Sequence, residues 1–297
     1  MALCVVVVLS ICLLCFCGVQ AISKQSDHTN LNEPNLISVL PSTQDDDFDC
    51  VDIYKQPALS HPLLKNHKIQ FATINTTKST TFHGAQATIA INGPPVSSDQ
   101  YSMAQVWVQS GPLNVIQAGW AVDGFKSTGC YNAQCPGFVQ VHPIYRPGQP
   151  FQNISIPRGT QYVFDVVITQ EPINGNWWLV ERNNLSIGYW PKELFNHLGD
   201  GAEVVRYGGT TSASKTGLSP QMGTGSLPNR DYRTGVGYFI QNKIMGSDFV
   251  MNDILLTEMV KNVDTSTACY DLGYYGFVAS DVRETFSYGG PGGSCGT

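Results

Sequence analysis

Alternation of apolar and polar residues is the main pattern of this chain from His83 onward. GAQATIAING alternates and ends in a Gly-Pro-Pro turn, and SMAQVWVQSG alternates again, with Met103, Gln105, Trp107 and Gln109 on one side. Alternation bounded by Gly, Pro or Asn predicts short, half-buried strands. Further strands are predicted at 115–122, 137–141, 162–169, 176–180, 204–208, 235–241 and 276–279.

One segment departs from this period. Pro191-Lys-Glu-Leu-Phe-Asn-His-Leu opens on proline and places Leu194, Phe195 and Leu198 on one face, which predicts a short helix. Many short strands at close spacing, with a single helix, predict an all-β protein folded as an antiparallel β-sandwich.

The first 82 residues differ in composition and lack this regular alternation. Residues 1–21 are an apolar run ending at Ala21, which resembles a secretory signal peptide without its basic n-region, and a membrane anchor is the alternative. Residues 22 to about 48 are polar and predict disorder. The next block, DFDCVDIYKQPALSHPLLKNHKIQ, mixes proline with apolar anchors, and a Lys/Ser/Thr-rich connector follows from Asn75 to Thr81. We expect a signal peptide (1–21), a largely irregular propeptide (22–82) and a sandwich domain (83–297), in a secreted protein of the extracellular space or cell wall that has no membrane contact after signal removal.

Composition and cysteines agree with secretion. Charged residues make up 13% of the 297 residues, the formal net charge is -6, and no long basic run supports nucleic-acid binding. Four of the nine cysteines lie in the signal peptide, and an oxidising compartment favours the local pairs Cys130–Cys135 and Cys269–Cys295, leaving Cys50 over. Three sequons predict N-glycosylation, at Asn75, Asn153 and Asn184.

The stretch Val115–Gln140 holds the first candidate for chemistry. Its apolar strand carries one amide, Gln117, and leads to the cysteine loop. No G-x-S-x-G elbow, H-E-x-x-H helix or phosphate-binding loop is present, and beyond His83 the only histidines are His142 and His197. We therefore expect no metal and no cofactor, and look to carboxylate or carboxamide chemistry on a sheet.

A collinear set of motifs carries a resemblance to a known family. DCVDIYKQPALSHPLLKNHKIQ, GAQATIAI, VIQAGWAV, TGCYNAQCPGFVQ, GNWWLV, IGYWPKELF, YGG, QMGTG and YGGPGGSCG cover roughly residues 48–297. In these the chain resembles the neprosin family of secreted plant proteins. The resemblance implies a β-sandwich with two disulfides, made as a precursor that its own activation peptide inhibits. It also implies a glutamic peptidase that cleaves next to proline at acidic pH.

The family's catalytic positions are substituted in this chain. By the resemblance, one glutamate falls at Gln117 and the second, in W-G-G-E, at Thr210, with Glu203 upstream as a substitute. In a Gln–Glu site the amide holds the oxyanion and a carboxylate, here Glu203 or Glu181, activates water. Core or sheet hydrogen bonding is the alternative role of Gln117, and Glu181 itself is expected to face solvent.

Large aromatic side chains are candidates for a substrate cleft, although aromatics in a sandwich more often belong to the core. Arg206 is expected to pair with a surface carboxylate. The cleft candidates are Trp120, Trp177, Trp178, Tyr189 and Trp190.

We expect a secreted, acid-activated, proline-directed glutamic peptidase of impaired activity, whose substrate is a peptide or protein, with Pro-rich sequences as candidates. The alternative is a catalytically inactive extracellular relative that binds Pro-rich peptides or cell-wall glycans.

Overall fold

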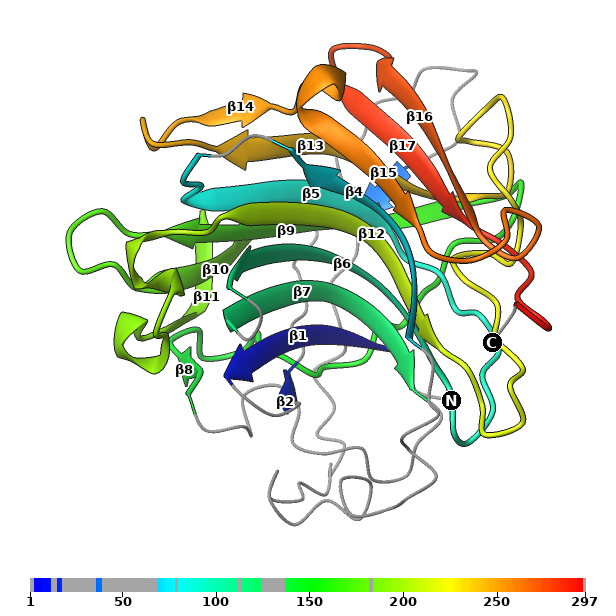
Figure 1. Cartoon of the computed structure of the whole chain (residues 1–297), viewed down its shortest axis with the longest axis horizontal. Helices are drawn as coiled ribbons and strands as arrows, with labels where there is room; N and C mark the ends of the chain where they lie inside the picture. The colour runs from blue at the N-terminus through cyan, green and yellow to red at the C-terminus, as the bar shows by residue number, and fades with distance from the viewer. Residues whose placement is uncertain are drawn as a thin grey trace.

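A computed structural model describes residues 69–77, 80–111, 114–123, 137–181 and 184–295, together with the backbone of three strands nearer the N-terminus. Strands account for most of the ordered structure, and they form two sheets (Figure 1). The predicted all-β antiparallel sandwich is confirmed.

The first sheet has seven strands, which pair antiparallel throughout. Figure 1 shows β12, β6, β7 and β1 as successive arcs. The order across the sheet is β15 (Met259–Val263), β4 (Ile69–Thr76), β12 (Val204–Ser212), β6 (Tyr101–Ser110), β7 (Asn114–Asp123), β1 (Leu3–Ile11) and β2 (Cys15–Cys17).

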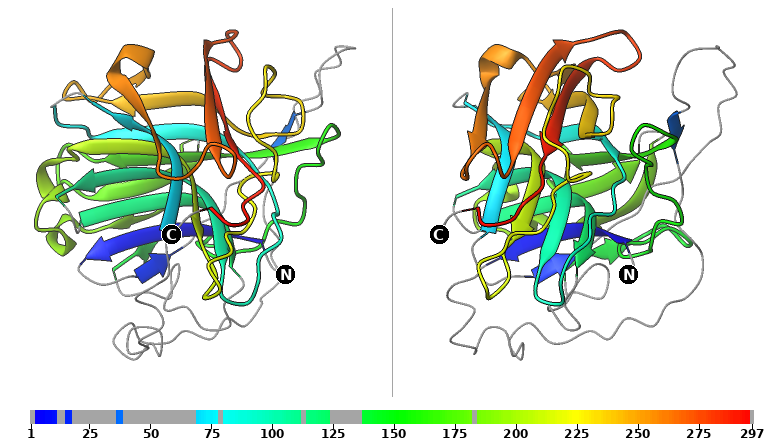
Figure 2. Two further views of the ribbon diagram at one scale, coloured as in Figure 1. Left: turned by 45° about the vertical axis from the view of Figure 1, so that its right-hand side comes forward. Right: turned by 90° about the vertical axis from the view of Figure 1, so that its right-hand side faces the viewer.

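The second sheet has ten strands, and its C-terminal members cross the upper part of the molecule in both views of Figure 2. Its main path is β16 (Asp271–Phe277), β17 (Glu284–Gly289), β13 (Gly237–Met245), β5 (Gly84–Ala90), β9 (Gln161–Gln170), β10 (Trp177–Glu181), β11 (Leu185–Trp190) and β8 (Val139–Gln140). Beside that path, β14 (Met251–Asp253) pairs with β13, and β3 (Leu36–Ser38) pairs with β9.

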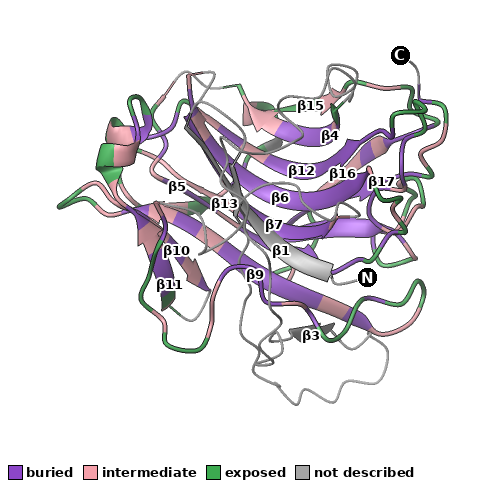
Figure 3. Cartoon of the chain, turned by 90° about the horizontal axis from the view of Figure 1, so that it is seen from below, coloured by how far each residue is buried: buried purple, intermediate pink, exposed green. Residues whose placement is uncertain are grey.

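The core lies between the sheets, and burial follows the central strands in Figure 3. Strand β7 sends Ala118 and Trp120 inward, because alternate residues of a strand point to one face. The indole Nε1 of Trp120 donates to the carbonyl oxygen of Ala90 at 2.8 Å, so the buried ring keeps its polar atom bonded. The aromatic pair Phe239 and Phe286 stacks with centroids 4.7 Å apart.

The predicted helix after Pro191 forms as two single 3-10 turns, η4 (Lys192–Leu194) and η5 (Leu198–Asp200). Phe195 is extended between them, and the side-chain oxygen of Asn114 accepts from the N–H groups of Asn196 and His197 at 2.8 and 3.1 Å. Those donors are therefore unavailable to a continuous helix. A third turn, η6 (Leu256–Glu258), precedes β15.

Strand β4 comes from the region expected to be propeptide. It lies between β15 and β12 and so belongs to the seven-stranded sheet. Its sequence IQFATINT puts Phe71 and Thr73 on one side and the buried Ala72 and Ile74 on the other. The sequence predicts no strand here, because the last residues of β4, Asn75 and Thr76, belong to the predicted polar connector. The expected signal peptide contributes β1, which pairs with β7, and its cleavage stays a prediction.

The predicted disulfide Cys269–Cys295 is present. The predicted pair Cys130–Cys135 lies outside the described residues. Among the sequons, Asn153 and Asn184 are exposed, whereas Asn75 is half-buried in β4, and glycosylation stays a prediction at each. Within the described residues, no helix is long and apolar enough to cross a membrane.

Gly119 of β7 is required by the close approach of β6. A Cβ at this position would lie 1.9 Å from the carbonyl oxygen of Ala104 and 2.6 Å from the Cα of Gln105, both backbone atoms. We expect Gly119→Ala to lower the free energy of unfolding by about 1–3 kcal/mol, measured by urea denaturation. Gly199→Ala is the matched control, since a Cβ there meets nothing within 4 Å. Equal midpoints for the two variants would contradict the packing argument.

His142 caps the loop after β8 through a neutral ring nitrogen. Its Nδ1 accepts from the backbone N–H groups of Ile144 and Tyr145 at 3.2 and 2.8 Å. Burial lowers the pKa of His142 below its ordinary value, so the loop is stabilised above about pH 6.5 and loses that stabilisation as the pH falls. Amide hydrogen exchange, corrected for intrinsic rates, should accelerate at Tyr145 between pH 7 and pH 5. The amides around His83 serve as control, because the ring nitrogen of His83 is hydrogen-bonded to the side-chain oxygen of Gln170 and not to a backbone N–H.

Candidate functional site

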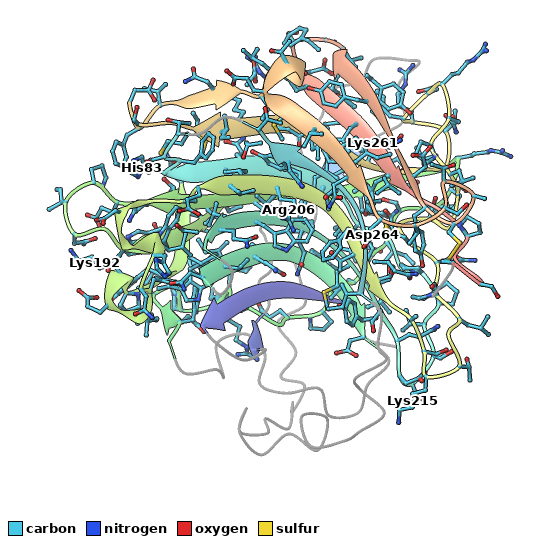
Figure 4. The ribbon with its side chains drawn as sticks, in the orientation of Figure 1. His83, Lys192, Arg206, Lys215, Lys261 and Asp264 are labelled. Carbon is cyan, nitrogen blue, oxygen red and sulfur yellow. A yellow bond between two sulfur atoms is a disulfide. The ribbon has the colours of Figure 1, made fainter. Side chains whose placement is uncertain are left out.

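The face of the seven-stranded sheet opposite the core, here called the outer face, gathers the polar residues of its central strands. Residues paired across strands carry their side chains on the same face. Gln117 of β7 pairs with Trp107 of β6, which pairs with Arg206 of β12, which pairs with Asn75 of β4. These four residues form the first row of the site, and Figure 4 shows Arg206 over the middle of the sheet.

Two further rows lie beside the first. Gln105 is the centre of the second row, with Gly119 and Gly208 as its partners on the two flanking strands. The third row holds Met103 and Thr210. Because glycine has no side chain, neither of these two partners places a side chain beside the Gln105 amide. The outer face is thus amide-rich at its centre and flanked by Trp107 and Met103 along β6.

Arg206 is a half-buried cation without a carboxylate partner in the described part of the chain. Its Nε is buried and has no hydrogen bond, and its guanidinium carbon lies 5.8 Å from the centroid of the Phe71 ring. Desolvation lowers the pKa of Arg206 from its ordinary value. The expected surface ion pair is therefore wrong: the salt bridges among the described residues join Arg233 to Asp231, Lys261 to Asp271 and Arg283 to Asp253.

The two substituted glutamate positions share the outer face but not a row. Gln117 is half-buried, and Thr210 is 6% exposed, with an Oγ1 that has no hydrogen-bond partner. The register puts them two strands and four residues apart, which is about 10 Å across the strands and about 13 Å along them.

Neither acidic candidate is placed beside Gln117. Glu203 precedes β12 and is exposed, and its Oε2 accepts from the backbone N–H of Gly111 at 3.0 Å, at the end of the β6–β7 hairpin. Glu181 ends β10 in the other sheet and is 3% exposed, so its expected solvent position is wrong. Gln117 thus has no glutamate in its own row or in the neighbouring Gln105 row of described residues.

One carboxylate does belong to the outer face of β7. Asp123 pairs with Tyr101 of β6, and burial together with the Asp123 charge raises the pKa of the Tyr101 phenol well above its ordinary value. Asp123 lies six residues from Gln117, about 20 Å along the strand. This distance is too long for the two side chains to share one water molecule.

Three of the five aromatic cleft candidates belong to the core. Trp120, Trp177 and Trp190 have no exposed surface, because large rings fill the space between the sheets, so their assignment to a cleft is wrong. Trp178 and Tyr189 are half-buried and pack against each other on β10 and β11, with centroids 4.8 Å apart.

Trp107 and Gln105 lie in the site, but the sequence motifs did not indicate them as site residues. Alternation along β6 predicts that they share one side of the strand, but it does not predict which residues of the adjacent strands lie beside them. No cluster of three or more His, Cys, Asp or Glu residues suited to a metal ion occurs in the described ranges.

The unpaired hydroxyl of Thr210 leads to a stability test. Thr210→Val removes a buried polar atom without a partner, so we expect the free energy of unfolding to stay unchanged or rise by up to about 1 kcal/mol. In the control, Thr88→Val, the lost hydroxyl donates to the buried Asp165 at 2.5 Å, and we expect a loss of about 1–3 kcal/mol. Chemical denaturation measures both, and a Thr210→Val loss as large as that of the control would show that Thr210 is bonded.

Sequence and structure comparisons relate the chain to known proteins. The chain is similar to scytalido-glutamic peptidase, in a crystal structure with a transition state analog inhibitor, at 12% identity and a TM-score of 0.36, over 74% of this chain and 96% of that one. The family model described as Neprosin activation peptide matches residues 39–118, a range that includes β4, β5 and β6. The family model described as Neprosin matches residues 120–291, more than half of the chain. The chain belongs to the neprosin family.

Proposed function

We propose that this chain is a secreted, peptidase-like member of the neprosin family that binds an extended peptide on its outer face and hydrolyses it poorly. The observation that carries the proposal is the first row of the site. Gln117 stands there in one row with Trp107 and Arg206, at the position where the resemblance puts the first glutamate of a glutamic peptidase.

The chemistry of the row accounts for weak hydrolysis. An amide such as Gln117 can donate to a developing oxyanion, but it cannot take a proton from water. Thr210 offers a hydroxyl with no base beside it in the described residues. General acid–base catalysis typically contributes about 10²–10⁴-fold to a rate, so loss of the acidic pair removes that part of the acceleration.

The same residues suit peptide binding. An extended peptide presents backbone N–H and C=O groups at regular spacing, and the amides of Gln117 and Gln105 can both donate and accept. Trp107 adds an aromatic surface of the kind on which proline rings pack. These features support a preference for proline-containing peptides.

A precursor form is supported by burial. Gln105, Met103 and Trp107 are only 1–2% exposed in the full chain, although they lie opposite the core. This low exposure, together with the activation-peptide match, supports a precursor whose outer face is covered before processing. It also supports inhibition of the precursor by its propeptide.

The test uses the secreted chain incubated at acidic pH with a fluorescent proline-containing peptide. Fluorescence anisotropy should detect binding, and mass spectrometry should detect cleavage at least about 10²-fold slower than that by an active glutamic peptidase under the same conditions. Gln117→Ala should weaken binding, because one amide of the row is lost. Cleavage by the wild-type chain that is as fast as that of the active peptidase and disappears in Gln117→Ala would overturn the impairment. Absence of binding would overturn the peptide-binding role.

A further inference from the structure

Arg206 lies in a half-buried position, where an unpaired cation loses hydration and so destabilises the fold. Its side chain is half-buried, its Nε is excluded from solvent, and no described carboxylate accepts from it. A buried charge is ordinarily paired, because desolvation of an ion is otherwise uncompensated. The other described arginines and lysines that form salt bridges do so with exposed or partly exposed aspartates.

The described neighbours of Arg206 on the outer face are neutral. Its cross-strand neighbours Trp107 and Asn75 carry no charge, and Phe71 lies under the guanidinium on β4. Stacking on an aromatic ring orients the guanidinium plane and leaves its N–H edge open to an acceptor. Along β12 the outer-face neighbours are Val204 and Gly208, so no acidic side chain of this strand competes for that edge.

We propose that Arg206 is the recognition point for a carboxylate of the bound peptide, a role that rests on the proposed peptide-binding function. The planar fork of arginine matches a carboxylate with two parallel hydrogen bonds. Gln117 lies two strands away in the same row, across Trp107, so the peptide that presents a carboxylate to Arg206 also reaches the amide. The chain therefore selects acidic peptides.

Two sources of carboxylate share this chemistry, namely an acidic side chain and a free C-terminus. Three fluorescent peptides of equal length distinguish them. One has a central glutamate and an amidated end, one has glutamine in its place and an amidated end, and one has glutamine and a free C-terminal carboxylate. Anisotropy titrations use the full chain before and after acid incubation, measured near neutral pH and at low salt.

We expect the wild-type chain to bind at least one carboxylate-bearing peptide about tenfold or more tightly than the neutral peptide, with a ratio that shrinks at high salt. Arg206→Met, which keeps an unbranched apolar stem and removes the charge, should bring the three affinities within about twofold. Arg206→Lys should restore only part of the preference, because lysine lacks the fork. Arg233→Met is the matched control, since this exposed arginine pairs with Asp231 away from the outer face, and its preference should equal that of the wild type.

The outcomes separate the two proposals. Equal affinity of the wild type for all three peptides, or a preference that survives in Arg206→Met, overturns the role of Arg206 and leaves peptide binding intact. Failure of every peptide to bind in either form overturns the peptide-binding function itself.

Stability provides a readout that needs no ligand. Removing an unpaired half-buried charge should raise the Tm of Arg206→Met or leave it unchanged. A fall of several degrees would show that the guanidinium is satisfied within the chain and would overturn the inference.

Discussion

The in-register antiparallel pairing of β7, β6, β12 and β4 is the constraint on which the rest of the structure depends. Side chains alternate along each strand, so one register assigns both faces at once. It sends Trp120 and Tyr207 into the core and aligns Gln117 with Arg206 on the outer face. A slip of one residue would exchange these sets, which would bury the guanidinium and expose the large rings.

Close approach of the strands is part of the same constraint. Gly119 and Gly208 flank Gln105, and a Cβ at either position would meet backbone atoms of the neighbouring strand. The two glycines permit the pairing and also place no side chain of their own beside the Gln105 amide. These two glycines therefore determine both how closely the strands pack and how much space lies beside Gln105 in the candidate site.

Electrostatics then distinguishes this outer face from an acidic catalytic site. Its centre carries amides, a hydroxyl and one cation, and the nearest acid on β7 is Asp123, at the end of the strand. Such a surface can donate and accept hydrogen bonds, and at its centre the described residues include no group that takes a proton from water at low pH. Membership of the neprosin family and the proposed weak hydrolysis are compatible, because the fold and the acidic pair are separate properties.

The sequence by itself determined the fold class, most of the strands, the Cys269–Cys295 bridge and the family, because alternation, turn residues and motif order are local signals. It also predicted that Gln117 and Thr210 replace acidic residues. Local signals missed β4, whose last two residues begin the predicted connector, and misassigned the segment after Pro191, where the Asn114 side chain takes the donors of a longer helix. Only the tertiary structure decided which face each aromatic ring occupies, that Glu203 caps a hairpin, and that Arg206 stands beside Trp107 without a carboxylate partner among the described residues. Those facts depend on pairing between strands about 100 residues apart in sequence, which no local pattern records.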